Sequence, residues 1–205
     1  AILSAVFMTG VQIMLKKSYK ELDSSVAFLF DMLFGLLIWI PIGFIFGATV
    51  SGVISCLAYA VISAILSEAL VFYALSKGNL SVSTVLISTY PVYTLLFSLL
   101  INNEKLLPIQ IILVLITIIG TILTAFDKEF KFKNMKDFSA IIPFVTAIAI
   151  GLSDTLTKGI INTTSSFDFI VAIALVQIPV ALIYLMIAKQ NLKKIILLMI
   201  ILCYL

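Results

Sequence analysis

Long apolar stretches, separated by short polar clusters, make up nearly the whole chain. They cover residues 1–15, 26–46, 50–75, 80–101, 106–126, 138–161, 167–188 and 195–205. About 20 apolar residues in a helix cross the hydrocarbon core of a bilayer, and all stretches except the first and the last reach this length. No stretch alternates as a barrel strand would, and a helix bonds its backbone polar groups internally. The pattern predicts an all-α integral membrane protein with eight helices, the first and last of them cut short by the chain ends.

The composition also indicates that the outer surface of the protein contacts lipid. The chain is 62% hydrophobic and 11% charged, whereas soluble domains are about 45–50% apolar and about 25% charged. The net charge of +3 comes from 13 lysines against 10 acids. The lysines lie mostly in short loops and form no basic face for nucleic acid. The sequence has no His, and Cys56 and Cys203 both lie in apolar runs, so we expect inert thiols, no metal site and no cofactor. The expected location is a cell membrane (plasma or inner), crossed several times.

An internal repeat appears when the sequence is shifted by 141 residues. The shift carries the first helix onto the sixth, and the matching residues are Gly10 with Gly151, Leu15 with Leu156, Lys17 with Lys158, Ser24-Ser25 with Ser165-Ser166, and Phe28 with Phe169. Five helices in one unit is an odd number, so the second unit is predicted to cross the membrane inverted. We expect a first repeat over 1–126, a charged linker loop over 127–137, and a second repeat over 138–205. By this period the second repeat would need roughly 60 further residues, so about 7.5 helices of ten are present.

Residues 73–125 carry a resemblance to a known family. The pieces, in order, are Tyr73-Ala74-Leu75, a turn, a run of small residues, Pro91, Glu104 and a Leu-rich helix with Gly120; Gly10 with Lys17 recurs as Gly151 with Lys158. Together they resemble the EamA domain of the drug/metabolite transporter superfamily. The resemblance implies ten helices in two inverted five-helix units that export small metabolites or drugs. This chain departs from the family at Phe30-Asp31, where an Arg is usual near the start of the second helix.

Three acids lie within predicted helices: Glu68, Asp154 and Asp31. Ionisable groups inside a membrane are costly and mark ion or substrate pathways. Glu68 has no Lys within one turn, and burial in a low dielectric favours the protonated form of a carboxyl, so this residue could bind and release a proton. A structural pairing with another helix is the alternative. Asp154 stands four residues before Lys158, where a local ion pair is plausible, and Asp31 is close enough to its helix start to reach the headgroups.

The predicted fourth helix is rich in hydroxyl groups around a proline. Pro91 has no N–H for the carbonyl of Ile87 and predicts a kink, beside which Ser88, Thr89 and Tyr90 could line a cavity. Hydrogen bonding between helices is the alternative for these hydroxyls. Two amides inside predicted helices, Gln12 and Gln177, could face a substrate or join helices.

These features favour a secondary transporter that moves a small molecule by alternating access, with proton coupling through Glu68 and export as the expected direction. A membrane packing or assembly subunit without transport is the first alternative. A membrane-embedded enzyme is less favoured, because no nucleophile with a base and no acid pair at helical spacing occurs within a span. The sequence leaves open whether the protein forms a homo-oligomer.

The orientation in the membrane has two conflicting indicators. The loops after the first, third, fifth and seventh helices carry most of the lysines, and lysine-rich loops favour the cytoplasmic side. This distribution predicts an external N-terminus, whereas the family resemblance implies a cytoplasmic one. The lysine pattern and the resemblance therefore leave the orientation open.

Overall fold

The computed structural model describes residue 10 and residues 23–77, 80–103, 105, 107–125 and 138–190. Every regular element in these ranges is helical. The helices are α2 (Ser24–Ile45), α3 (Val50–Ser63), a π-helix η1 (Ala64–Ala69), α4 (Leu70–Lys77), α5 (Leu80–Ile87), α6 (Tyr90–Ile101), α7 (Pro108–Ala125), α8 (Phe138–Ile161) and α9 (Ser166–Ile187). The predicted helices at 26–46, 50–75, 80–101, 106–126, 138–161 and 167–188 are confirmed with ends shifted by at most two residues. The predicted helices at 1–15 and 195–205 and the linker at 127–137 lie outside the described residues, apart from Gly10.

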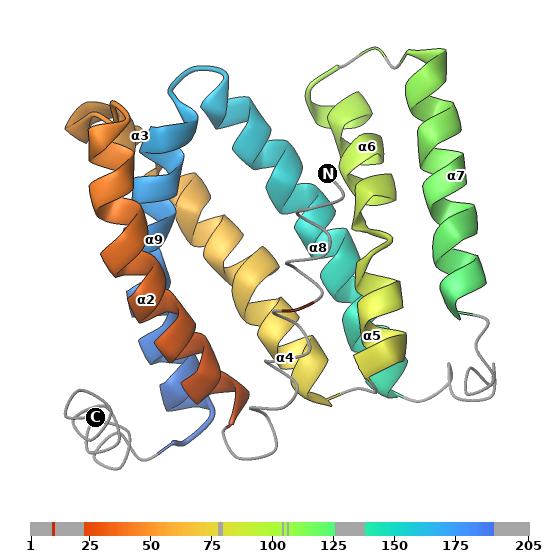
Figure 1. Cartoon of the computed structure of the whole chain (residues 1–205), viewed down its shortest axis with the longest axis horizontal. Helices are drawn as coiled ribbons and strands as arrows, with labels where there is room; N and C mark the ends of the chain where they lie inside the picture. Colours follow the sequence, from red (N-terminus) through yellow and green to blue (C-terminus); the bar gives the residue numbers. More distant parts are fainter. Residues whose placement is uncertain are drawn as a thin grey trace.

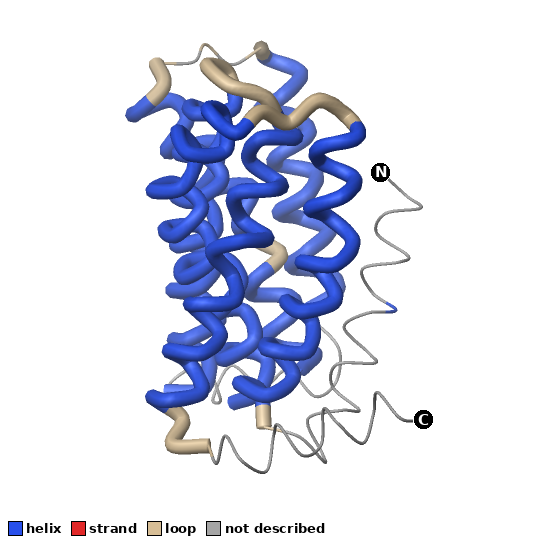
Figure 2. Tube along the Cα trace, turned by 90° about the vertical axis from the view of Figure 1, so that its left-hand side faces the viewer, coloured by secondary structure: helices blue, strands red, loops and turns tan. Residues whose placement is uncertain are grey.

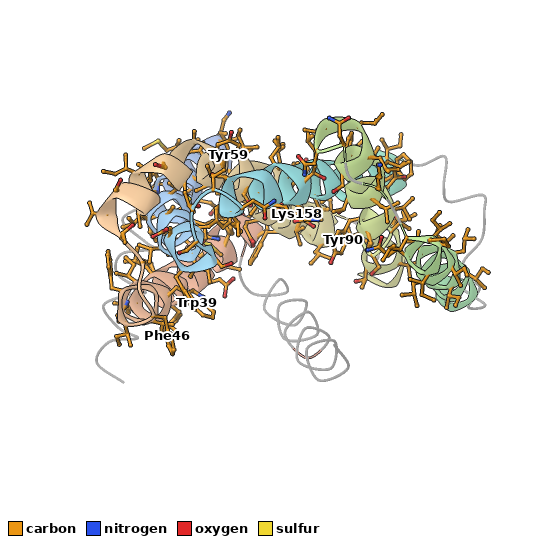
Figure 3. All side chains as sticks on the ribbon, turned by 90° about the horizontal axis from the view of Figure 1, so that it is seen from above. Trp39, Phe46, Tyr59, Tyr90 and Lys158 are labelled. Atoms are coloured by element: carbon orange, nitrogen blue, oxygen red, sulfur yellow. The ribbon has the colours of Figure 1, made fainter. Side chains whose placement is uncertain are left out.

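Five helical segments of the described chain are long and apolar enough to cross a membrane. They are Ser24–Ile45, Val50–Lys77, Ser83–Ile101, Ile141–Ile161 and Ser166–Ile187. A shorter apolar helix covers Pro108–Gly120. Large apolar side chains cover their outer surfaces, and Trp39 and Phe46 project outward from α2 (Figure 3). An apolar exterior over several spans is the surface of a multi-pass membrane protein.

The helices run along one common axis, with most described loops at the two ends (Figure 2). Helices α2, α3 and α9 form one end of an elongated layer, α7 stands at the other end, and α8 lies between them (Figures 1 and 3). Helix α9 packs on α2 and α3, and α8 packs on α3, α5 and α6. This arrangement places α8 at the junction of the two ends of the layer.

Two apolar clusters hold the α2–α3–α9 group together. One contains Phe28, Phe72 and Leu185, and the other contains Cys56 and Val171. Cys56 is buried, as expected from its apolar surroundings in the sequence, and its sulfur contacts the Thr164 hydroxyl; the inertness of the thiol stays a prediction. The opposite directions of α2 and α9 (Figure 1) are those that an inverted repeat requires of its second and seventh helices, and the repeat itself stays a prediction.

Two of the spans are irregular in their interiors. Between α3 and α4 the helix widens to π geometry over Ala64–Ala69, a form that occurs mostly as a single turn and often at functional sites. The predicted fourth helix is interrupted at residues 88–89, about halfway along its length (Figures 1 and 2). Both irregular segments contain residues that the sequence marked as candidates.

Candidate functional site

Three carboxyl groups lie about two helical turns or more from the nearer ends of their spans. They belong to Asp31 in α2, Glu68 in η1 and Asp154 in α8. Asp31 is exposed on the described bundle, whereas Glu68 and Asp154 are half-buried. Helix α2 shares one apolar cluster with η1 and α4, and α4 shares another with α5 and α8. These shared clusters relate the heights of the three acids in the bundle.

The three acids and the break in the fourth span lie at a similar height. The Phe28 and Phe72 rings are 5.0 Å apart between centroids, and Ile87 shares an apolar cluster with Ile150. Asp31 follows Phe28 by about one turn, and Glu68 precedes Phe72 by about one turn on a span that runs in the opposite direction (Figure 1).

Asp154 lies about one turn beyond Ile150, and Tyr90 lies about one turn beyond Ile87, in helices that run in the same direction (Figure 1). Electrostatics agree with this geometry. The carboxyl of Glu68 interacts with those of Asp31 and Asp154, and the Tyr90 hydroxyl interacts with Asp154. The structure therefore brings Glu68, Asp154 and Tyr90 together, with Asp31 at the margin.

The break between α5 and α6 is held by side-chain hydroxyls. The hydroxyl of Ser88 donates to the Thr84 carbonyl at 2.7 Å, and that of Thr89 donates to the Leu86 carbonyl at 2.7 Å. The Thr89 N–H also turns to the Leu86 carbonyl, at 3.2 Å, which tightens the last turn of α5 as at other helix ends. Pro91 then occupies the first turn of α6, where its missing N–H is tolerated. The predicted kink is thus a full interruption.

The start of α6 packs directly against α8. The Thr94 hydroxyl lies 3.5 Å from Oδ2 of Asp154 and donates to it, while the Thr155 hydroxyl donates to the Thr94 carbonyl at 3.1 Å. A Cβ on Gly151 would stand 2.6 Å from the Thr94 backbone nitrogen. The side chain of Asp154 is therefore held against the first turns of α6 by the Thr94 hydroxyl.

Some buried hydroxyl groups among the described residues have no partner, and two of them belong to residues that directly precede an acid in the sequence. In the described part of the chain, four buried oxygens have no hydrogen-bond partner: Oγ of Ser67, Ser83 and Ser153, and Oγ1 of Thr84. Ser67 precedes Glu68 and Ser153 precedes Asp154 in the sequence. Buried polar groups are nearly always paired, so such exceptions call for an explanation.

Replacing Ser153 by alanine is expected to raise the melting temperature of the purified protein. An unpartnered buried polar group costs about 1–3 kcal/mol, and the Ser153 hydroxyl is such a group. Thr155→Val on the same helix is the matched control and is expected to lower the melting temperature, because it removes the bond to the Thr94 carbonyl. Equal destabilisation of both variants would show that the Ser153 hydroxyl is bonded.

The remaining candidates from the sequence fall in different places. Gln12 lies outside the described residues. Gln177 is buried within α9, which leaves both of its proposed roles open, and the ion pair of Asp154 with Lys158 stays a prediction. Among the described residues, no three His, Cys, Asp or Glu side chains come together in a group that could hold a metal ion.

Sequence reasoning did not identify the π-helical segment around Glu68 or the unpartnered hydroxyls of Ser67 and Ser153. The π segment has no residue signature, because its sequence, AILSEA, is compatible with an ordinary helix. The two serines could have been noticed as small polar residues that directly precede the intramembrane acids.

The first 126 residues of the chain match a known family of proteins. The model of the EamA-like transporter family matches residues 1–126. Neither the curated proteins nor the solved structures give a match to the chain. The family match covers more than half of the chain, includes the helices that carry Asp31, Glu68 and Pro91, and confirms the resemblance seen in residues 73–125. Its members are membrane transporters and not enzymes. The chain therefore belongs to the EamA-like transporter family.

Proposed function

We propose that this protein is a proton-coupled secondary transporter that exports a small metabolite or drug by alternating access. The observation that carries the proposal is the meeting of Glu68, in a π-helical segment, with Asp154, beside an interrupted span. Interrupted helices and intramembrane carboxyls are the elements from which transporters build substrate and ion sites.

Glu68 is the proton-binding group in this proposal. It is half-buried, and the carboxyls of Asp31 and Asp154 lie within electrostatic range of it. Protonation of Glu68 removes one negative charge from the group, and release of the proton restores it. A substrate that binds near the acids therefore meets a less negative electrostatic potential when Glu68 is protonated than when it is not.

The polar lining of the substrate path comes from α5, α6 and α8. Asp154 and Tyr90 supply charge and a hydroxyl, and the unpartnered hydroxyls of Ser83 and Ser153 supply further bonding groups. The small-molecule substrate would form the hydrogen bonds that these groups do not make within the protein. A polar substrate is expected for this reason.

Alternating access would arise from movement of one five-helix unit against the other. The 141-residue shift maps Ser24 at the start of α2 onto Ser165 at the start of α9. The two helices run in opposite directions and pack on one another (Figure 1). This supports an inverted repeat over 1–126 and 138–205, with the linker at 127–137 between the units.

The test is gradient-driven flux in proteoliposomes. An imposed pH gradient is expected to drive accumulation of at least one member of a panel of polar metabolites and drugs, and a protonophore is expected to abolish it. Protein-free liposomes are the control. If no panel member moves while the protein is inserted and monodisperse, an assembly role without transport becomes the better explanation.

A further inference from the structure

One carboxylate joins two turns that are far apart in the sequence. Asp168 is 5% exposed in the first turn of α9. Its Oδ1 accepts the Thr49 N–H at 2.6 Å and lies 3.3 Å from the Thr49 hydroxyl, and its Oδ2 accepts the Ser165 N–H at 3.1 Å. Thr49 is the N-cap of α3, and Ser165 is the N-cap of α9. The carboxylate thus ties the α2–α3 turn to the α8–α9 turn.

The two turns lie at the same end of the bundle (Figure 1). Under the repeat, the α2–α3 turn belongs to the first unit and the α8–α9 turn to the second. The Asp168 carboxylate faces the N-terminal ends of both α3 and α9, whose partial positive charges stabilise it. Charge-assisted hydrogen bonds are roughly twice as strong as neutral ones, so this connection is strong for its size.

Two glycines allow the backbones to approach at this end. A Cβ on Gly52 would overlap the Asp168 carboxylate, and a Cβ on Gly43 would overlap the Val171 side chain. Any larger residue at either position would separate the helices. The small residues therefore permit the contact that the carboxylate then fixes.

Further contacts surround the carboxylate. The rings of Phe46 and Phe167 stack with centroids 5.4 Å apart and planes 15° apart. The Cys56 sulfur lies 3.3 Å from the Thr164 hydroxyl oxygen and is fully buried. Apolar contact and hydrogen bonds together close this end between the two units.

The opposite end of the same helix pair is joined by neutral groups. There the Ser24 and Tyr184 hydroxyls are 2.9 Å apart, and Phe28 lies against Tyr184 with ring centroids 6.0 Å apart. Asp23 at that end caps its own helix by accepting from the N–H and hydroxyl of Ser25. Within the described residues, a buried carboxylate therefore joins α9 to the α2–α3 turn at the Asp168 end, whereas neutral hydroxyls join α2 and α9 at the other end.

We infer that Asp168 is a latch that holds one end of the transporter closed, and that this end opens when the bonds from Thr49 to Asp168 break. The inference rests on the alternating-access mechanism proposed above, but its geometry does not depend on substrate or coupling ion. A buried carboxylate that loses its donors is unstable. The latch therefore favours two discrete arrangements, closed with Thr49 bonded or open with Asp168 hydrated.

Cys56 reports the state of the latch. In a Cys203→Ser background the protein is treated with N-ethylmaleimide in membranes, and the labelling rate of Cys56 is measured by mass spectrometry. Labelling is expected to be slow in this background and at least ~10-fold faster in Asp168→Asn. The amide lacks the charge, and its NH2 group replaces one of the two oxygens that accept from the Thr49 and Ser165 N–H groups. Gly52→Ala displaces the carboxylate sterically and is expected to accelerate labelling in the same direction.

Two control variants separate the latch from ordinary helix capping. Asp23→Asn changes a cap at the opposite end, and Ser165→Ala weakens the α9 cap but leaves the Thr49 bond to Asp168 in place. Both are expected to label within ~2-fold of the background rate. Unchanged labelling in monodisperse Asp168→Asn and Gly52→Ala protein, or equal acceleration in Asp23→Asn, would overturn the latch. The readout needs no substrate, so a failed flux assay with accelerated labelling would count against the proposed function alone.

Discussion

Glu68→Gln is expected to lower pH-gradient-driven flux by at least ~100-fold, the scale at which a positioned proton-transfer group contributes. Glutamine keeps the size of the side chain and resembles the protonated acid, but it cannot release a proton. Exchange of substrate against substrate at equal pH should continue, because that half of the cycle does not require a change in protonation. Loss of gradient-driven flux with retained exchange is therefore the expected result.

Asp31→Asn is the matched control for this experiment. Asp31 interacts with Glu68 and lies at a similar height, yet its side chain is exposed on the described bundle. Its replacement removes a nearby charge without removing the half-buried acid, so most of the gradient-driven flux is expected to remain. Full activity in Glu68→Gln would contradict proton coupling through Glu68, as would an equal loss in both variants.

The helices themselves were predictable because lipid leaves few alternatives. A span must be apolar, long and helical, so the apolar runs nearly coincide with the helices, and the predicted 138–161 matches α8. The polar clusters between them include helix caps such as Asp23, Thr49 and Ser165. Local chemistry therefore determined the ends as well as the number of the described spans.

The interruptions inside the spans were only partly predictable. Pro91 predicted a kink, because its nitrogen carries no hydrogen to donate to the Ile87 carbonyl. The place and extent of the break depend on the Ser88 and Thr89 hydroxyls, which bond carbonyls of α5. The π turn around Glu68 has no comparable local cause, although η1 packs against α8 and α9.

Long-range pairings were the least predictable part. The spacing of Ser165 and Asp168 is typical of a capping box, and the box is present. That the same carboxylate also accepts from Thr49, 119 residues away, depends on the packing of α9 against α3. Likewise, the sequence suggested Glu68, Asp154 and Asp31 as separate candidates, and only the crossing of their helices brings them into electrostatic contact.

Gly151→Ala is expected to destabilise the protein by about 2–3 kcal/mol, the upper part of the range for overpacking, and to reduce flux with it. A Cβ at this position would stand 2.6 Å from both the Thr94 nitrogen and the Tyr93 Cβ. Neither atom is the end of a flexible side chain, so α6 and α8 must separate. That separation also stretches the Thr155 bond to the Thr94 carbonyl and displaces Asp154 from Thr94.

Gly159→Ala on the same helix distinguishes this close approach from the general effect of removing a helical glycine. A Cβ on Gly159 would meet Asn102 Oδ1 at 3.8 Å, an ordinary contact. Alanine is favoured over glycine within a helix by about 0.5–1 kcal/mol, so Gly159→Ala should be neutral or stabilising in thermal unfolding. Opposite shifts in melting temperature for the two variants would locate the effect at the α6–α8 crossing. If Gly151→Ala leaves the stability unchanged, α6 and α8 can separate without cost. The contact between Thr94 and Asp154 would then not be needed to position Asp154 beside the interrupted span.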